Sequence, residues 1–435
     1  MNKSVLLFCD NFEAAIQAGN VGTLSISVPL ELVDNLFSVV ATSQQKYLKS
    51  PGFPVGNVPL SYVKEHQKDI IIEHLKQFLL NYRVINFLKD ECIQRKIPIA
   101  GSPRLVNIAF DITKEVTFYF ECTKADKISI QDWKYFNFKA PKRKNYKDLD
   151  RQVEYFIAEE VSLAQKHQDQ AIALCDWVLF CVTVLDGEKK PIMDTFTQHF
   201  WFKMGDEEVE SSLRDLFIGK KIGDIFITED QGFQEYFSTI LQTDFAFLVE
   251  VIDVVPYAYF DFELFKRYFK LKTTKDLHKK LIEVFSFRHD ISQRRATVED
   301  TLKLLIQKHK ITAPIHMMLR QKNKLLRAIR ENPDYTVYKK QADFEQRVDE
   351  LAQKQASELV FVDQFAHSED LVVTPLDMKG YLMLTQRNRM KDFLYFDIPE
   401  STENGHEIPV PLEEIKRVCL LEKGINHAIY HLTKK

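Results

Sequence analysis

The segment Ser50-Pro51-Gly52-Phe53-Pro54-Val55-Gly56-Asn57-Val58-Pro59 separates two apolar, helix-patterned segments. Prolines lack a backbone donor and push the preceding residue towards extended geometry, and glycines permit positive φ, so the segment cannot remain helical. It predicts a stiff loop, after which Pro59 suits the first turn of a new helix. Phe53, Pro54 and Val55 occupy its tip. Such an apolar tip either contacts a partner or folds back onto its own domain, and both readings stay open.

Length and composition indicate a multidomain globular protein. The chain has 435 residues, of which 45% are hydrophobic and 28% are charged, which allows two to four domains. Lys and Arg total 59 against 62 Asp and Glu, so the net charge of -3 gives no general attraction to nucleic acid. No run reaches the roughly 20 apolar residues of a membrane span, and we expect no membrane partner. The apolar patch near Met1 stops at Asp10, which is too short for a signal peptide.

The motifs that would indicate metal, nucleotide or hydrolytic chemistry are missing from the sequence. Its six cysteines are scattered without a C-x-x-C pair, so the sequence indicates neither a zinc site nor a disulfide framework, and a reducing cytoplasm fits best. There is no G-x-x-x-x-G-K-[ST], G-x-G-x-x-G, H-E-x-x-H or G-x-S-x-G motif. We therefore expect no cofactor and no metal.

The first 120 residues read as an α+β unit. Residues 23–28 alternate between apolar and polar side chains, which predicts a strand, and the apolar residues that follow Pro29 recur at helical spacing. After the loop, a long helix is expected from Ser61 to about Lys96, ended by a Pro- and Gly-rich turn at residues 97–103. Residues 105–112 and 115–122 then predict two strands. The unit is thus two helices on a small antiparallel sheet, joined by the loop.

Residues 121–170 read as a linker and a connecting helix that packs with the C-terminal part. Its basic cluster at residues 139–144 lies beside aromatic side chains and could contact RNA. A run this short next to a proline is more typical of a solvated linker, and we interpret it so. The connecting helix is expected from Lys147 to about Ala164.

Residues 171–255 predict a compact β-rich domain, and residues 256–435 a helical one. Strands are expected at residues 177–185, 196–202 and 244–255, with a helix-like stretch at residues 207–217. The helical part carries apolar stripes between Pro, Gly or Asn-Pro signals, and its expected helices cover residues 264–269, 277–289, 298–310, 315–331, 344–365, 375–386 and 412–432. Core packing accounts for most of these stripes. Their number leaves open a partly exposed apolar cradle, for instance along Ile315, Met317, Met318, Leu319, Leu325 and Leu326.

In this order of domains the chain resembles trigger factor, the ribosome-associated bacterial chaperone. Gly52, Phe53, Gly56 and Pro59 stand where the family has its G-F-x-x-G-x-x-P loop. The resemblance spans essentially the whole chain. It implies an α+β, multidomain fold: a ribosome-binding N-terminal domain (1–120), the linker and connecting helix (121–170), an FKBP-like prolyl isomerase domain (171–255) and an all-helical chaperone domain with extended arms (256–435). It further implies the family's roles in protein folding, protein transport and cell division.

The implied ribosome-binding residues are those of the loop, Gly52, Phe53, Pro54, Val55, Gly56 and Asn57. In the family, basic residues follow the phenylalanine and the second glycine, whereas here Pro54, Val55 and Asn57 occupy those places. Each lost cation removes a charge-assisted contact, so we expect weak or altered docking that depends on Phe53 and on shape. Lys46 and Lys49, just before the loop, are candidates to replace the missing cations.

The implied isomerase pocket is less complete. The resemblance assigns its catalytic wall to Asp194, Phe200, Val209, Tyr236 and Phe247, together with Met193, Glu210 and Leu213. Such a pocket holds proline among aromatic side chains and favours the twisted amide without a nucleophile. Four positions depart from the pattern: Cys181 and Leu213 replace aromatic residues, Glu210 replaces an apolar residue and Ser212 replaces a glycine. A carboxylate in a proline pocket is unfavourable unless it is paired, so we expect weakened isomerase activity. Phe200 and Phe247 could equally fill a small β core.

Three hypotheses follow for the function. The first is an ATP-independent cytoplasmic chaperone that binds nascent and unfolded chains at the exit tunnel of the large ribosomal subunit and forms a homodimer when free. The second is a working prolyl isomerase whose helical arms recruit substrate. The third is a non-ribosomal adaptor or holdase that retained only the architecture.

Overall fold

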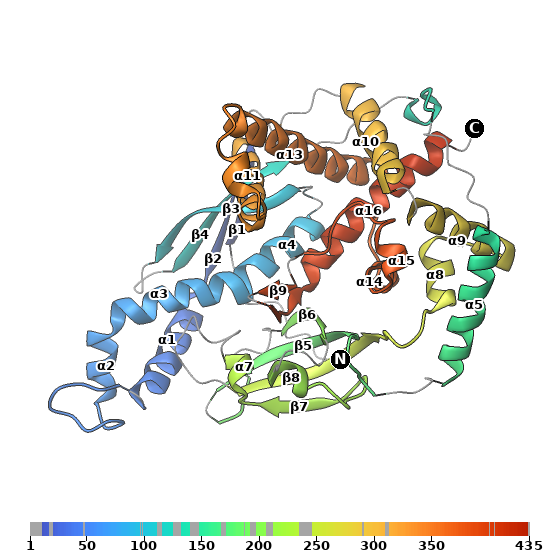
Figure 1. The fold of residues 1–435 in the computed structure, drawn as a ribbon. Helices are drawn as coiled ribbons and strands as arrows, with labels where there is room; N and C mark the ends of the chain where they lie inside the picture. The colour runs from blue at the N-terminus through green and yellow to red at the C-terminus, as the bar shows by residue number, and fades with distance from the viewer. Residues whose placement is uncertain are drawn as a thin grey trace.

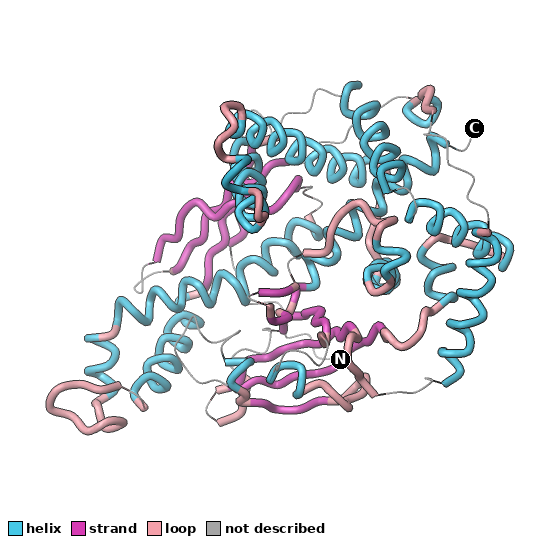
Figure 2. The backbone as a smooth tube through the Cα atoms, viewed as in Figure 1, coloured by secondary structure: helices cyan, strands magenta, loops and turns pink. Residues whose placement is uncertain are grey.

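The computed structural model contains two main sheets that do not pair with each other, with helices between and around them (Figure 2). The residues that it describes are 11–16, 21–46, 48–95, 97, 99–110, 115–124, 132–139, 148–166, 171–186, 188–191, 197–205, 212–234, 246–288, 291–308, 313–399, 401–403 and 405–433. None of the helices in these ranges is long and apolar enough to cross a membrane. Nor do these ranges bring three or more His, Cys, Asp or Glu side chains together in a way that could hold a metal ion.

The first sheet has four antiparallel strands in the order β1-β2-β4-β3. They are β1 (Asn11–Ile16), β2 (Val21–Val28), β3 (Ile99–Phe110) and β4 (Val116–Lys124). The alternation predicted for β2 is confirmed, because Leu24 and Ile26 are buried and pair with Phe120 and Phe118 of β4. Strand β1 was not predicted. The expected turn at residues 97–103 was wrong in part, since β3 already begins at Ile99 and absorbs the Gly and Pro residues in a register irregularity.

Helices cover one face of this sheet, and together they form what we call the N-terminal module (β1–β4 and α1–α4; Figure 1). The helices are α1 (Leu30–Gln45), α2 (Leu60–His66), α3 (Lys68–Leu79) and α4 (Ile85–Gln94). The prediction of a single long helix after the loop is wrong in part, because this segment is interrupted twice. Gln67 leaves helical geometry at φ -104°, and residues Leu80–Val84 form a π-helical turn. The apolar face is nevertheless continuous, since Ile71, Leu75 and Phe78 are all buried.

The second sheet, which we call the central sheet, has five strands in the order β11-β6-β5-β8-β7. Its strands are β5 (Trp177–Leu185), β6 (Thr197–Lys203), β7 (Ile225–Thr228), β8 (Ala246–Val255) and β11 (Val410–Pro411). The first helical turn beside it is α6 (Ser212–Asp215), and α7 (Gln231–Phe233) follows β7. The strands predicted from the sequence are confirmed as β5, β6 and β8, whereas β7 and β11 were not predicted.

The C-terminal part is dominated by the predicted helices. They are α8 (Phe262–Tyr268), α9 (Thr274–Arg288), α10 (Ile291–Lys308), α11 (Ile315–Glu331), α13 (Phe344–Ser368), α14 (Pro375–Thr385) and α16 (Leu412–Thr433). Two further short helices are α12 (Tyr335–Tyr338) and α15 (Asn388–Lys391). The connecting helix α5 (Leu149–Lys166) packs on α9 and shares its core. Besides β11, two unpredicted strands, β9 (Thr402–Glu403) and β10 (His406–Glu407), form a small ribbon.

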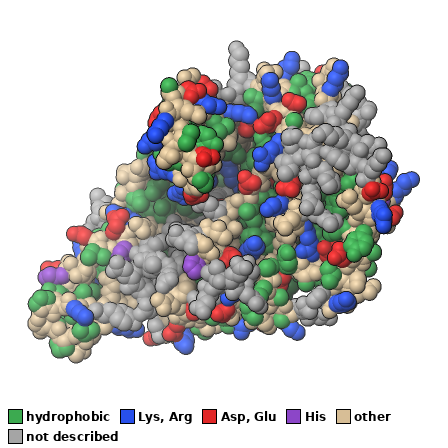
Figure 3. Space-filling view, in the orientation of Figure 1, with side chains coloured by type: hydrophobic (Ala, Val, Ile, Leu, Met, Phe, Trp, Pro, Cys, Tyr) green, Lys and Arg blue, Asp and Glu red, His purple; other side chains and the backbone are tan. Residues whose placement is uncertain are grey.

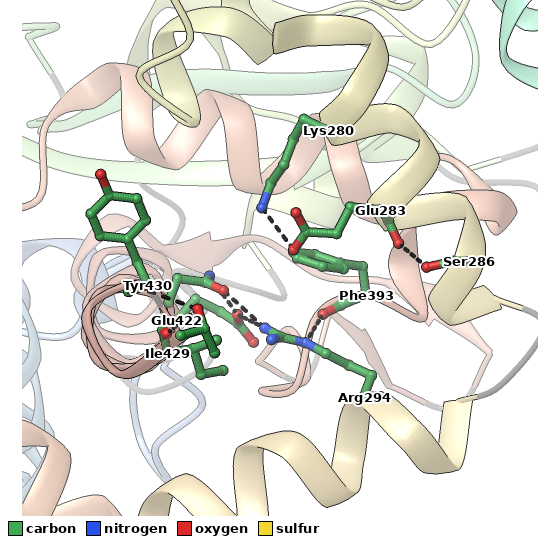
Figure 4. Close-up of polar contacts among 10 residues, drawn as sticks. Lys280, Glu283, Ser286, Arg294, Phe393, Glu422, Ile429 and Tyr430 are labelled. Atoms are coloured by element: carbon green, nitrogen blue, oxygen red, sulfur yellow. Dashed lines mark hydrogen bonds and ion pairs between the residues drawn. The ribbon is translucent and has the colours of Figure 1, made fainter. Parts of the chain in front are cut away.

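A buried ion pair connects helices α10 and α16 of this C-terminal part (Figure 4). Arg294 of α10 lies 4.0 Å from the Glu422 carboxylate of α16, and its Nε donates to the Phe393 carbonyl at 2.9 Å. Glu422 is fully buried and also accepts from the backbone amides of Tyr395 and Phe396. Burial raises the pKa of Glu422, while Arg294 opposes that rise. The pair therefore joins α10, α16 and the segment that follows α15.

Candidate functional site

The loop between α1 and α2 is built from two successive β-turns. The Phe53 amide donates to the Ser50 carbonyl at 3.2 Å, and the Asn57 amide donates to the Pro54 carbonyl at 3.0 Å. The third residue of each turn is a glycine with positive φ, +88° at Gly52 and +82° at Gly56. Both turns thus have the form of type II, which requires a glycine there. The sequence pattern of the loop is explained by these two turns.

The loop presents an apolar tip and is anchored at its base. Residues 51–57 are all exposed, with Phe53 at 37% and Val55 at 55% of their full accessibility. Val58, by contrast, is completely buried in the core of the N-terminal module. The loop therefore projects from a fixed base, as Figure 1 shows at the far end of α1 and α2.

An aromatic stack that the sequence analysis missed supports the Phe53 ring. The ring lies 5.3 Å from that of Tyr62, which in turn stacks on His66 at 3.8 Å. The Ser50 hydroxyl donates to the Tyr62 hydroxyl at 3.1 Å, so the stack also holds the start of the loop. The available signal was the spacing of Tyr62 and His66, because side chains four apart share one face of a helix. Lys46 and Lys49 are exposed near the loop, which makes them accessible cations.

The residues expected to form an isomerase wall are brought together only in part. Phe200 and Phe247, on β6 and β8, are 4% and 0% exposed and belong to the core of the central sheet. Leu213 of α6 is buried in the same core. The other five predicted wall residues, Met193, Asp194, Val209, Glu210 and Tyr236, lie outside the described residues.

This core contains a cluster of phenylalanine side chains. Phe180 stacks on Phe200 with ring centroids 5.8 Å apart and contacts Phe217 at 4.8 Å, and Phe233 lies 5.6 Å from Phe247. Such tilted and offset contacts are typical of packed aromatic cores. Cys181 lies on β5 of the same sheet, and burial raises the pKa of its thiol to about 11, so the thiol stays protonated at neutral pH. Nucleophilic chemistry at Cys181 is therefore not expected.

A hairpin of two helices forms a second candidate surface. Helices α11 and α13 pack along each other, joined through α12, and we call them the helical hairpin. Met317 of α11 is buried, but Ile315 and Leu319 on the same helix are 73% and 50% exposed. Figure 3 shows a hollow between this hairpin and helices α3 and α4, with hydrophobic side chains on its walls. The helical stripes thus serve both core packing and an exposed apolar surface.

The hairpin is fastened to the N-terminal module. The Asp363 carboxylate of α13 accepts from the Gly101 amide at 2.9 Å and from Arg417 at 3.0 Å. Met317 packs so closely on Gly101 that an added Cβ there would lie 2.5 Å from its terminal methyl group. These contacts hold α13 against β3 of the N-terminal module.

The basic cluster predicted in the linker, residues 139–144, lies outside the described residues apart from Lys139. In the aromatic segment before this cluster, the Trp133 indole donates a hydrogen bond to Glu369 at 2.8 Å. Glu369 also pairs with Lys134 at 3.0 Å and with His427 at 3.2 Å. This part of the linker therefore packs on the C-terminal helices.

Comparison with known proteins places this geometry in context. Residues 12–156 match the family model for the N-terminal domain described as "Bacterial trigger factor protein (TF)". The trigger factor of Rickettsia massiliae (strain Mtu5) is 21% identical over 420 residues, covering 94% of this chain and 91% of that protein. The trigger factor of Rickettsia rickettsii (strain Sheila Smith) is 22% identical over 422 residues with the same coverage. A solved structure described as "Promiscuous Substrate Recognition in Folding and Assembly Activities of the Trigger Factor Chaperone" covers 97% of this chain and 100% of its own at 15% identity and a TM-score of 0.36.

Proposed function

The chain is a divergent relative of trigger factor, and on that premise we propose that it is an ATP-independent chaperone for nascent and unfolded polypeptides at the ribosome exit. The observation that carries the proposal is the exposed, apolar double-turn loop within the residues that match the trigger factor N-terminal domain. We place its activity in the cytoplasm, where nascent chains emerge.

Docking through the loop would depend on shape and apolar contact. Phe53 and Val55 are the exposed large apolar side chains of the tip, and no charged residue stands between Ser50 and Pro59. Lys46 and Lys49 are the nearest exposed cations along the chain. If they replace the missing loop cations, binding weakens steeply with salt, because phosphate contacts release counterions.

Cosedimentation with ribosomes across a salt series tests the docking. We expect Phe53→Ala to reduce binding at every salt concentration, and Lys46→Ala with Lys49→Ala to flatten the salt dependence. Val106→Ala is the matched control, because Val106 is as exposed as Val55 but lies on β3. Unchanged binding by Phe53→Ala would contradict docking through this loop.

Client binding would use dispersed apolar contacts on the helical hairpin. Ile315 and Leu319 offer exposed aliphatic surface on α11, and the hairpin to which α11 belongs borders the hollow in Figure 3. Weak contacts of this kind accept many sequences, since no single pocket dictates one. Suppression of the aggregation of a proline-free unfolded protein, without ATP, is the expected activity. Failure in that assay would leave the adaptor hypothesis.

Isomerase activity is expected to be weak. The aromatic side chains Phe200 and Phe247 are packed in the core of the central sheet, which leaves little of their surface for a proline ring. A protease-coupled assay on a proline-containing peptide should therefore give a rate far below that of an efficient isomerase. A high rate would favour the working isomerase, with the hairpin as its recruiting surface.

A further inference from the structure

The helical hairpin carries a local excess of positive charge. Residues 315–340, which include α11 and α12, contain seven Lys and Arg residues but only two acidic residues. The whole chain, by contrast, has 59 Lys and Arg against 62 Asp and Glu. The excess is therefore a property of this part of the hairpin, and Figure 3 shows basic side chains along it.

Helix α11 has a packed face and an outward face. It packs along α13, and its partly buried aliphatic side chains are Met318, Leu325, Leu326 and Ile329. The outward face carries four exposed cations, which are Arg320, Lys324, Arg327 and Arg330. Successive members of this set are three or four residues apart, so they are neighbours on the helix surface. At 1.5 Å per residue they extend over roughly 15 Å, and we call them the cationic face.

The acidic residues at the start of α13 do not neutralise this cationic face. They pair with Lys322, whose Nζ lies 2.7 Å from Asp349 and 3.8 Å from Glu345. Lys324 and Arg330 form no ion pair with any residue that the structure describes. Like charges three or four residues apart on a helix repel one another, so an acidic ligand on this face would relieve an unfavourable arrangement.

Exposed aliphatic side chains adjoin the cationic face. Ile315 and Leu319, at the N-terminal end of α11, are 73% and 50% exposed. We propose that this surface selects acidic segments of unfolded polypeptides, whose carboxylates pair with Lys324 and Arg330 and whose aliphatic side chains contact Ile315 and Leu319. The guanidinium of Arg330 can hold a carboxylate through two parallel hydrogen bonds. The inference rests on the proposed client binding at the hairpin and names the class of client that it favours.

An acidic polypeptide fits this surface better than RNA or a membrane does. Sites for single-stranded RNA combine cations with aromatic side chains on which the bases stack, and α11 contains no Phe, Tyr or Trp. A helix that lies in a membrane surface turns its whole apolar face to the lipid, whereas α11 packs along α13. A polypeptide that is both acidic and aliphatic uses the cations and the exposed aliphatic side chains together.

The test compares two labelled, proline-free unfolded peptides that have the same aliphatic residues. One peptide contains Asp and Glu, and in the other Asn and Gln replace them. Fluorescence anisotropy with the full chain measures both affinities. At low salt we expect the acidic peptide to bind about fivefold more tightly, because each of a few exposed ion pairs contributes modestly. High salt should remove the difference, since exposed charges are screened.

Charge reversal tests whether the cationic face causes this preference. Lys324→Glu combined with Arg330→Glu should abolish the preference and leave the affinity for the amide peptide unchanged. Lys275→Glu combined with Lys279→Glu is the matched control, because both lysines are exposed on α9 and the net charge changes by the same amount. Leu319→Ser should instead weaken the binding of both peptides by a similar factor. Circular dichroism checks that all these variants remain folded.

Two outcomes would overturn the inference and leave client binding at the hairpin intact. They are equal affinities of the unaltered chain for the two peptides, and equal affinities of the double variant and its control for the acidic peptide. If neither peptide binds, the proposed client binding fails as well. An oligouridylate probe addresses RNA. If it binds more tightly than the acidic peptide at the same salt, and Lys324→Glu with Arg330→Glu removes that binding, the face recognises RNA instead.

Discussion

At the residue scale, Gly52 determines where Phe53 points. Its φ of +88° allows the first turn of the loop, and the Phe53 amide closes that turn on Ser50. The ring then rests against Tyr62, which leaves it 37% exposed. A side chain at Gly52 would meet no neighbour, so the constraint comes from the backbone alone.

Substitution of Gly52 should therefore disturb the loop without affecting the core. We expect Gly52→Ala to strain the turn by about 1–3 kcal/mol and to accelerate hydrogen exchange of the Phe53 amide. Gly405→Ala is a matched control, because Gly405 has φ +86° and equally open surroundings but lies far along the chain from the loop. Equal exchange rates at Phe53 in both variants would contradict a role for Gly52 in closing the turn.

A second residue-scale prediction concerns the ion pair in Figure 4. Arg294→Met leaves the buried Glu422 carboxylate without its cation, which should lower the free energy of unfolding by about 3–5 kcal/mol. Because burial raises the pKa of Glu422, the folded state takes up its proton before the unfolded state does as pH falls. The loss should accordingly be larger near pH 8 than near pH 5, because lower pH favours the neutral form of Glu422, which does not require a cation.

Urea unfolding at the two pH values measures this effect. Lys322→Met is the control, because Lys322 pairs with the partly exposed Asp349 at 2.7 Å and should change stability little. A loss that is independent of pH would show that the cost comes from packing around Phe393 and not from the charge.

The residues of the candidate site were predictable to different degrees. Gly52, Phe53 and Gly56 follow from local rules, since turn geometry depends on adjacent residues. The burial of Phe200 and Phe247 could not be predicted from such rules, because an aromatic side chain suits both a proline pocket and a packed core. Their burial depends on Phe180 and Phe233, which contact them only after the sheet has formed. The residues adjacent to Phe200 and Phe247 in the sequence therefore do not distinguish a pocket wall from a packed core.

At the scale of elements, long helices were predictable and short strands were not. Helix α11 begins and ends as predicted, because its apolar stripe and the flanking Pro314 and Asn332 are local signals. Strands β7 and β11 have four and two residues, and their pairing energy comes from distant partners on β8 and β6. Too few residues alternate in either strand for a period of two to be recognised.

Strand β11 makes a testable connection between the helical part and the central sheet. Val410 pairs with Trp201 of β6 and is 1% exposed, and both residues belong to the core shared with the C-terminal helices. Val410→Asp would place an unpaired carboxylate in that core, which is costly. We expect it to release the segment around residues 401–411 and to speed its cleavage in limited proteolysis.

The matched control for that experiment is Val372→Asp, since Val372 is 69% exposed. Its cleavage pattern should equal that of the unaltered chain. If Val410→Asp is cleaved no faster than the control, β11 does not hold the helical part to the sheet.

At the scale of the whole molecule, both hydrophobic and polar contacts hold the modules together. Buried residues of the N-terminal module and of the central sheet belong to one continuous hydrophobic cluster. The helical hairpin is joined to the N-terminal module at Asp363, which is buried between Gly101 and Arg417. Hydrophobic contact is not directional, whereas this carboxylate accepts from two fixed donors. Asp363 therefore helps to fix the orientation of the hairpin relative to the N-terminal module, and Figure 3 shows the hollow beside that hairpin.

Removal of that carboxylate should open the molecule. In Asp363→Ala the partly buried Gly101 amide and Arg417 guanidinium lose their shared acceptor, which should cost about 1 kcal/mol, the lower end of the range for an unsatisfied donor. We expect the hairpin to leave the N-terminal module for part of the time, which small-angle X-ray scattering would detect as a larger radius of gyration. Asp349→Ala is the matched control: Asp349 lies on the same helix but pairs with Lys322 inside the hairpin.

Because opening exposes the buried Met317, Asp363→Ala should also capture unfolded clients at lower concentration. An unchanged radius together with unchanged client capture would mean that the hydrophobic contacts alone hold the hollow closed.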